Sequence, residues 1–226
     1  PPIVLIASIT GAISQGDVKS EMRGDTTLQE HYDAAQRYQK DGDRDKAAAE
    51  YRAFLADALG QLAAARADAG HYAPAASLLN EALALVPDSQ ELNREYARTA
   101  LLAGDFARAE TLSRSFLHDY PGDPQRLAQA HQILGRALLK MNKDQEARKE
   151  LEAAVALDPS FANGYDLAVA CLDLDDEKCA TRIFAGLETS FGYFPVILLA
   201  IGLAYGNSDC APRAVGEFRK VCAMKP

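Results

Sequence analysis

Small and hydrophobic residues recur along the chain with a period near 34 residues. Gly70 and Gly104 are 34 residues apart, and the same interval separates Ala75 from Ala109. One series of alanines follows the repeat: Ala47, Ala75, Ala109, Ala147, Ala180 and Ala214. Within each repeat, a turn rich in glycine, aspartate or asparagine separates two stretches with helical spacing of apolar residues. The pattern therefore predicts an all-α fold made of helix–turn–helix units in series.

Six units follow from this register. They span approximately residues 28–55, 56–89, 90–127, 128–160, 161–194 and 195–226. A capping-box sequence from Thr27 to Glu30 predicts the start of the first helix, because both side chains satisfy amide groups at a helix N-terminus. Second helices are expected to stop before Pro87, Pro121 and Pro159, since proline cannot continue the helical hydrogen bonds.

In these units a small residue after the turn is followed four positions later by a larger one, as Ala75 is by Leu79. The small side chain lets two antiparallel helices approach closely. The clearest unit runs from Gly70-His71-Tyr72-Ala73-Pro74-Ala75 to Ala82-Leu83-Ala84-Leu85-Val86-Pro87. At these positions the chain resembles the tetratricopeptide repeat (TPR) family over residues 28–226. The resemblance implies a right-handed solenoid of about six helix pairs that binds proteins along the concave face of its first helices.

The concave face implied by this resemblance has a basic middle and an apolar final third. Its residues are Tyr32, Gln36, Arg94, Arg98, Arg136, Lys140, Val169, Leu172, Leu199 and Leu203. The four basic residues are candidate contacts for a carboxylate-bearing peptide, because guanidinium groups bind carboxylates bidentately. Ordinary pairing with acidic residues on the helix surface is the alternative.

Composition and charge narrow the function classes. The 226 residues are 48% hydrophobic and carry a net charge of −8, which excludes wholesale disorder and argues against nucleic acid or an anionic membrane as main partner. The longest apolar stretch, residues 3–13, is too short to span a bilayer. No nucleophile elbow, phosphate-binding loop or zinc-protease motif is present. We therefore expect a non-enzymatic protein with no cofactor and no metal site.

All four cysteines lie in the last two predicted units. Cys171 ends one predicted helix and Cys179 begins its antiparallel neighbour, so a disulfide across the turn is geometrically feasible. Two alternatives remain: Cys210 pairs with Cys179 or with another subunit, or the thiols stay free and buried.

Residues 1–27 are predicted to form an extended apolar arm followed by a polar linker. The hydrophobic residues of the arm are Ile3, Val4, Leu5, Ile6, Ile9 and Ile13. The stretch 3–13 is either an ordered arm of the mature protein or the remainder of a signal peptide. Both interpretations predict an exported protein, periplasmic or extracellular, and the family resemblance is to exported TPR proteins of bacterial type.

The last unit is expected to leave an apolar surface uncovered, because each repeat presents an apolar side to the next one. The surface expected to accept the arm of another copy consists of Val169, Leu172, Val196, Leu199, Leu203, Val215 and Val221. Head-to-tail docking of this kind builds open polymers. The leading hypothesis is therefore a homopolymer, an extracellular filament.

Three alternatives to the filament stay open. In the first, the chain is a monomeric periplasmic or cell-envelope adaptor that holds a peptide in its concave groove. In the second, it is the regulatory fragment of a larger enzyme. In the third, the arm folds back on the first unit of its own chain.

Overall fold

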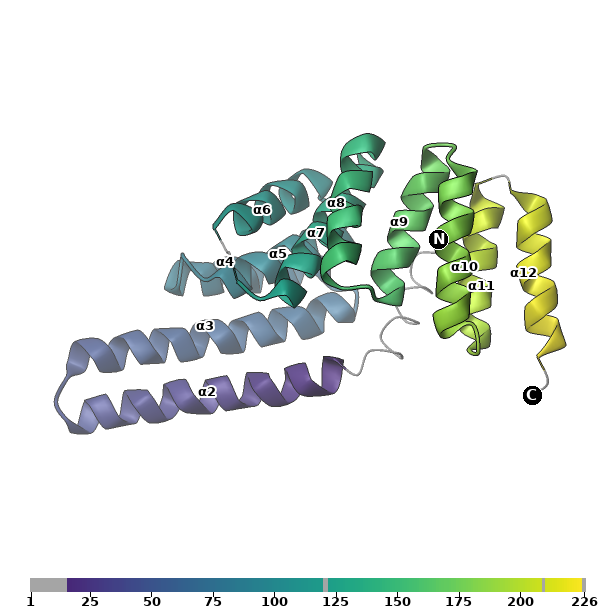
Figure 1. Ribbon diagram of the computed structural model, residues 1–226. Helices are drawn as coiled ribbons and strands as arrows, with labels where there is room; N and C mark the ends of the chain where they lie inside the picture. The colour runs from purple at the N-terminus through teal and green to yellow at the C-terminus, as the bar shows by residue number, and fades with distance from the viewer. Residues whose placement is uncertain (1–15, 120–121, 209, 225–226) are drawn as a thin grey trace. The chain divides into compact units, whose positions relative to one another are not determined.

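The computed structural model describes the backbone of residues 16–119, 122–208 and 210–224, and the side chains from residue 27 onward except that of residue 119. The predicted docking arm lies outside the described residues, with Ile3, Val4, Leu5, Ile6, Ile9 and Ile13. Every element of the described part is an α-helix, eleven in all (Figure 1). The predicted all-α fold of helix hairpins is confirmed.

The chain divides into two compact units, which we treat separately: an N-terminal unit of residues 14–120 and a C-terminal unit of residues 121–226. The helices of the N-terminal unit are α2 (Gly16–Lys40), α3 (Arg44–Asp68), α4 (Tyr72–Leu85), α5 (Gln90–Ala103) and α6 (Phe106–Asp119). Those of the C-terminal unit are α7 (Pro124–Lys140), α8 (Asp144–Leu157), α9 (Phe161–Asp173), α10 (Glu177–Phe191), α11 (Pro195–Asn207) and α12 (Ala211–Ala223).

The first helix begins earlier than predicted. Helix α2 starts at Gly16, so residues 16–27, expected to be a linker, are helical, and Thr27 lies inside the helix rather than at its cap. The stretch contains no proline, and its lysine, glutamate, methionine and arginine residues favour a helix. A capping-box sequence therefore does not by itself mark a helix start.

The predicted boundary between residues 55 and 56 is also wrong. Helix α3 runs without interruption through this point, and α2 and α3 form a long antiparallel hairpin (Figure 1). The sequence around the boundary is rich in alanine and leucine, which favour a helix, and it contains no proline. Gly60 lies inside the helix, where an added Cβ would be 2.7 Å from the Leu92 side chain, so it serves close packing instead of ending the helix. One helix thus serves as the second helix of the first unit and the first helix of the next.

The chain enters and leaves these helices at turns that the sequence predicts. Gly70 and Gly104, with φ of +80° and +82°, occupy the left-handed region that ends a helix and suits glycine. At the start of α3, the Asp43 carboxylate accepts a hydrogen bond from the backbone N–H of Lys46 at 3.2 Å. Helix α7 starts four residues before the predicted 128, because Asp123 caps it and Pro124 fits its first turn.

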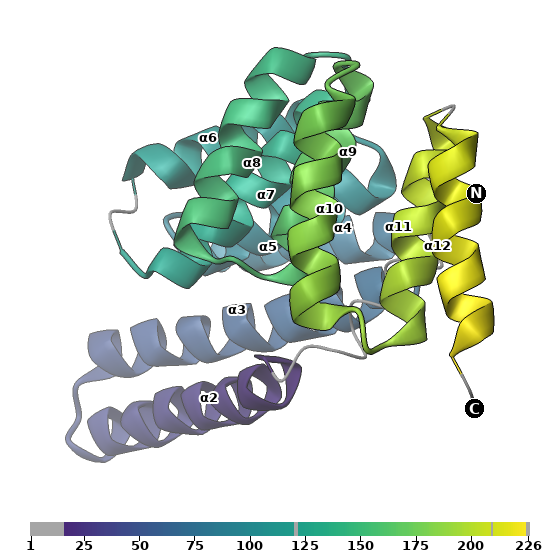
Figure 2. The same ribbon diagram turned by 45° about the vertical axis from the view of Figure 1, so that its right-hand side comes forward.

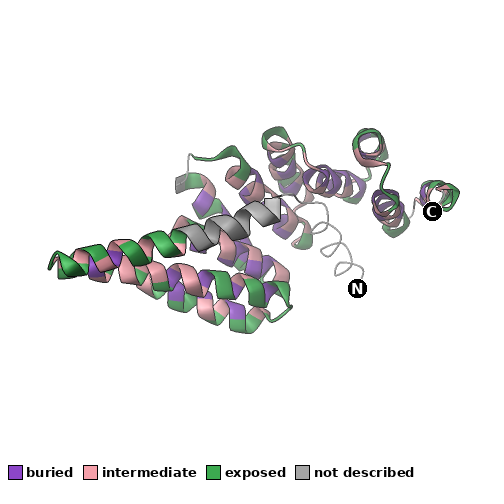
Figure 3. Ribbon diagram, turned by 90° about the horizontal axis from the view of Figure 1, so that it is seen from below, coloured by how far each residue is buried: buried purple, intermediate pink, exposed green. Residues whose placement is uncertain are grey.

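Successive helices of the C-terminal unit pack as antiparallel neighbours (Figure 2). Helix α9 also contacts the first helices on either side of it, α7 and α11, so the three form one layer. Helices α7 and α8 approach closely at Gly135, where an added Cβ would lie 2.6 Å from Cγ of Leu151. Buried residues line the sides where helices meet, and exposed residues cover the outside (Figure 3).

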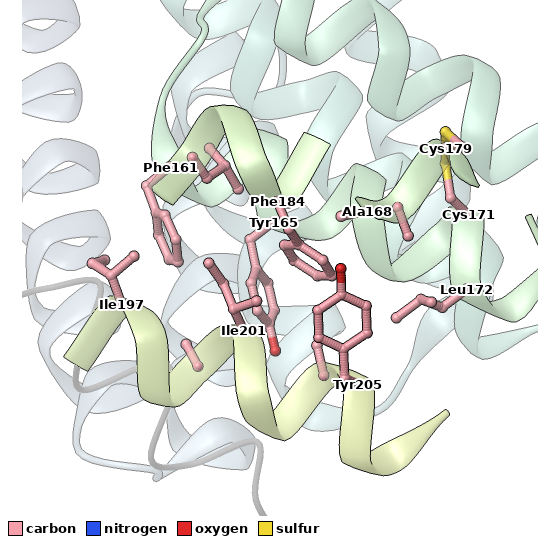
Figure 4. Packing of buried hydrophobic residues seen from close by; sticks show 14 of the residues in the cluster. Phe161, Tyr165, Ala168, Cys171, Leu172, Cys179, Phe184, Ile197, Ile201 and Tyr205 are labelled. Atoms are coloured by element: carbon pink, nitrogen blue, oxygen red, sulfur yellow. A yellow bond between two sulfur atoms is a disulfide. The ribbon is translucent and has the colours of Figure 1, made fainter. Parts of the chain in front are cut away.

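The main core of the C-terminal unit lies between α9, α10 and α11. Figure 4 shows Phe184 of α10 beside the rings of Tyr165 and Tyr205, whose centroids lie 6.1 and 5.0 Å from its own. Ile197 and Ile201 of α11 complete this side of the core and are fully buried. The aromatic and branched residues thus hold α11 against the preceding helix pair.

No helix among the described residues has the length and hydropathy to cross a membrane.

Candidate interaction surfaces

The predicted basic clamp is divided between the two units and is already paired with carboxylates. In the N-terminal unit, the Arg98 guanidinium donates to both carboxylate oxygens of Glu95 and, at 2.8 Å, to Oδ1 of Asp68. Burial disfavours the Arg98 charge, but the two carboxylates outweigh it and raise the pKa of Arg98. Arg94 likewise donates to Glu91 on its own helix.

The remaining two basic residues lie on α7 of the C-terminal unit. Nε of Arg136 lies 3.9 Å from Oδ2 of Asp166 on α9, and Gln132 donates to the same oxygen at 2.8 Å. Lys140, one turn beyond Arg136, is exposed. Each of the three predicted arginines therefore pairs with a carboxylate of this chain, which is the alternative that the sequence left open.

The pKa of the Asp166 carboxyl is set by two opposing effects, burial and nearby polar or cationic groups. Desolvation by burial raises its pKa, while Arg136, Gln132 and Lys140 lower it, and the balance is a raised pKa. The folded state therefore binds the proton of this carboxyl more tightly than the unfolded state. Stability contributed by this group is present at low pH and is lost as the pH rises from the ordinary aspartate value of about 4 through the raised one.

We expect Asp166→Asn to be more stable than the parent chain at neutral pH, because the amide has no charge to desolvate and still accepts from Gln132. The advantage should vanish below about pH 4, where the parent carboxyl is protonated. Urea unfolding at several pH values measures both. Arg136→Gln removes the favourable cation and should have the opposite effect, a steeper loss of stability with rising pH. Parallel pH profiles for the parent and Asp166→Asn would contradict this account.

Helix α11 differs from the other first helices because it has no polar side. Between Pro195 and Asn207 it contains no charged residue. One side is buried in the core through Ile197, Ile201 and Tyr205 (Figure 4). Leu199 and Leu203 are only partly buried and do not belong to that core cluster. The helix therefore keeps an apolar side that the described residues cover incompletely.

The seven residues predicted to accept the arm do not form one surface. Leu172 is 6% exposed and belongs to the core, so its predicted role is wrong: it packs inward with α11 instead of facing outward. Val215, which is 46% exposed, and Val221 lie on α12, a second helix. The remaining four lie on the first helices α9 and α11. Val169 and Val196 are partly buried against the core cluster, whereas Leu199 and Leu203 are partly buried outside it. We call these four residues the α9–α11 apolar face: Val169, Val196, Leu199 and Leu203.

Cys171 and Cys179 form a disulfide that links the end of α9 to the start of α10 (Figure 4). Their Cα atoms are 5.9 Å apart, as is usual for a bridged pair. Cys210 and Cys222 are free thiols, the first partly buried and the second exposed. No group of three or more histidine, cysteine, aspartate or glutamate side chains among the described residues is arranged to hold a metal ion.

Helix α3 carries a second apolar surface, which the repeat pattern did not predict. Leu55 and Leu62 are 50% and 45% exposed there. Beside them is a shallow hollow of about 390 Å³, lined by Leu62, Arg66, Pro74, Ser77 and Leu78. The interval from Ala47 to Ala75, 28 residues instead of 34, was the signal that this part of the chain departs from the regular repeat.

Comparison with known proteins identifies the repeat. Residues 66–132 and residues 128–161 each match a family model described as tetratricopeptide repeat. No curated protein matches the chain.

Several solved structures are similar to this chain. A crystal structure of MamA has 22% sequence identity and a TM-score of 0.56, and the alignment covers 70% of this chain and 91% of MamA. MamA 41-end from Desulfovibrio magneticus RS-1 has 21% identity and a TM-score of 0.55, with 73% and 97% covered. TTC0263, a thermophilic TPR protein in Thermus thermophilus, has 17% identity and a TM-score of 0.62, with 76% and 92% covered.

Identities at this level show a shared fold and nothing about partners. The matches to the repeat models add the sequence evidence, because they cover consecutive helix hairpins from the end of α3 to the end of α8. Together, the repeat matches and the fold show that this all-α solenoid carries tetratricopeptide repeats, which the family models match over residues 66–132 and 128–161.

Proposed function

We propose that this tetratricopeptide-repeat protein is a non-enzymatic protein–protein interaction scaffold that assembles with copies of itself. In this proposal, the uncharged segment of residues 3–13 of one copy docks on the α9–α11 apolar face of the next. A contact between two different surfaces can be repeated from copy to copy. It produces an open polymer when the rotation between neighbouring copies does not close a ring. The expected product is a filament.

The observation that carries the proposal is the apolar character of α11 on all sides. A helix without a polar side is normally enclosed by protein or lipid. Here Leu199 and Leu203 are only partly buried, on a helix too short to cross a membrane. An apolar ligand that covers this side of the helix would remove that surface from water.

Residues 3–13 have the chemistry of such a ligand. The segment contains no charge and is rich in isoleucine. Extended at about 3.3 Å per residue, eleven residues reach about 36 Å, enough to cross several helices. Burial of about 600 Å² of apolar surface yields about 15 kcal/mol before ordering costs, which is sufficient to drive assembly.

The disulfide supports the expectation that the protein works outside the cytoplasm, in the periplasm or extracellular space. Disulfides persist in oxidising compartments and are rare in the cytosol. We therefore propose that the protein is exported, because an oxidising compartment preserves the Cys171–Cys179 bond.

Assembly is tested with two variants of the whole chain. The face variant carries Leu199→Glu and Leu203→Glu, and the arm variant carries Leu5→Glu and Ile6→Glu. We expect each to remain monomeric in sedimentation velocity, because a buried unpaired carboxylate opposes docking, whereas the parent chain forms large particles. The control Leu157→Glu, on α8 at a site 38% exposed, should assemble like the parent.

Mixing the two variants makes the test specific. The arm variant keeps an intact face and the face variant keeps an intact arm, so an equimolar mixture should form dimers and stop there. Parent-like particles from both single variants would refute the docking. A monomeric parent chain would refute self-assembly and leave the second candidate, a cell-envelope adaptor that holds an apolar peptide from another protein on the same face.

A further inference from the structure

Helix α3 carries a stripe of leucines along one side. Leu55, Leu59 and Leu62 are spaced by four and three residues, which places them on the same side of a helix. Leu59 packs partly against the core of the N-terminal unit, whereas Leu55 and Leu62 are about half exposed. The stripe is bounded by Arg52 on one end and Arg66 on the other.

The same side of the first helix is buried in the later units. The residues that occupy the Leu62 position in the four units that follow are Tyr96, Leu134, Leu167 and Ile201, all buried. Those that occupy the Arg66 position are Ala100, Leu138, Cys171 and Tyr205, also buried. Among α3 and the four first helices that follow it, only α3 exposes the residues at these two positions, Leu62 and Arg66.

In α9 and α11, this side of the first helix packs on the second helix of the preceding unit. Leu167 of α9 packs in a cluster with Leu151 of α8. Tyr205 of α11 stacks edge-on against Phe184 of α10, with ring centroids 5.0 Å apart. The second helix that precedes the corresponding part of α3 is the first half of α3 itself. Because the helix is continuous, that half cannot fold back to cover the stripe.

The two arginines at the ends of the leucine stripe indicate that a partner bound to the stripe carries negative charge. The side chains of Arg52 and Arg66 are exposed, and within the described part of the chain neither makes an ion pair or a hydrogen bond. They are 14 residues apart, which is about 21 Å along the helix. The hollow beside Leu62, also lined by Pro74 and Leu78, extends the apolar surface toward α4.

We propose that this surface, the α3 leucine face (Arg52, Leu55, Leu59, Leu62 and Arg66), binds an amphipathic α-helix of another protein. A helix is the element that covers the equivalent side in the later units. Apolar residues of the partner at heptad spacing pack on the leucines, and its carboxylates pair with Arg52 and Arg66. This interface is independent of the proposed assembly, because it lies in the other unit of the chain.

A pair of model helices tests the proposal. Each fluorescent peptide has three heptads with leucine at the a and d positions, and glutamate fills e and g in one and lysine in the other. Like charges disfavour pairing of either peptide with itself. In fluorescence anisotropy with the whole chain, the glutamate peptide should bind at least about tenfold more tightly than the lysine peptide.

Two variants assign the binding to this surface. Leu55→Gln with Leu62→Gln should weaken the glutamate peptide more than about tenfold, whereas Leu157→Gln, an exposed leucine of α8, should leave it unchanged. Arg52→Glu with Arg66→Glu should reverse the preference in favour of the lysine peptide. Circular dichroism of each variant should match the parent chain, since all four side chains are largely exposed.

Three results would overturn the proposal. One is equal or absent binding of the two peptides, and another is binding that survives the Leu55→Gln, Leu62→Gln change. The third is pairing of this surface with a second copy of the chain. The face variant, Leu199→Glu with Leu203→Glu, blocks the proposed filament contact, so it should be monomeric. If it is a dimer instead, and adding Leu62→Gln makes it monomeric, the α3 leucine face binds itself.

Discussion

Phe184→Ala is expected to lower the free energy of unfolding of the C-terminal unit by about 3–5 kcal/mol. The side chain is 1% exposed and lies between Tyr165 of α9 and Tyr205 of α11 (Figure 4). Its removal leaves a cavity that neither ring fills without leaving its own packed position. Because α9, α10 and α11 meet here, the loss weakens the attachment of the last helix pair as well as the pair that contains Phe184.

Urea unfolding followed by far-ultraviolet circular dichroism measures this loss. Tyr193→Ala is the matched control, since Tyr193 is an aromatic residue on the turn after α10 and is 68% exposed. Its substitution should change the free energy of unfolding by less than about 0.5 kcal/mol. Similar values for the two variants would show that Phe184 is not a core residue and that the packing around it differs from that described.

The helix hairpins were predictable because their determinants are local. A proline beyond the first turn cannot continue a helix, and α4 and α8 end at Leu85 and Leu157, two residues before Pro87 and Pro159. A small residue after the turn is required wherever two helices approach closely, and Ala75 and Ala147 are fully buried. Neither signal depends on distant parts of the chain, so a repeated pattern was enough to show both.

The continuity of α3 could not be predicted from the pattern of turns. A helix ends where a residue stops it, and the period alone places a boundary even where no such residue exists. The interval from Ala47 to Ala75 is six residues shorter than 34. In physical terms, the missing residues are those that elsewhere form the turn between units. The exposed Leu55 and Leu62 are a consequence of this missing turn, so the surface was missed along with it.

The charged and apolar surfaces depend on contacts between helices that sequence spacing does not reveal. The Arg98 partner Asp68 lies 30 residues earlier, on α3, and the Arg136 partner Asp166 lies 30 residues later, on α9. Which arginines meet a carboxylate of another helix is decided by the rotation of each helix in the stack, whereas the pairs of Arg94 with Glu91 and of Arg98 with Glu95 lie within one helix. The same holds for Leu172, whose rotation toward α11 makes it a core residue. Local spacing placed these residues on the first helices but not on a particular side.

Removal of the disulfide between Cys171 and Cys179 is expected to lower the free energy of unfolding of the C-terminal unit by about 2.5 kcal/mol. The two cysteines are 8 residues apart, so the bond closes a short loop and restricts the unfolded chain. Both side chains are buried in the core, where they pack whether or not they are bonded. The effect therefore arises mainly from the unfolded state, and the helices themselves should persist in the reduced protein.

Urea unfolding of the parent chain and of Cys171→Ala with Cys179→Ala, each with and without a phosphine reductant, separates the bond from the side chains. The parent chain should lose stability on reduction and approach the double variant, which should not respond to the reductant. Cys222→Ala, which removes an exposed free thiol, should behave like the parent under both conditions. If reduction leaves the parent midpoint unchanged, the sulfurs are not bonded in the purified protein. The expectation of export would then rest on the composition of residues 3–13 alone, because no disulfide would indicate an oxidising compartment.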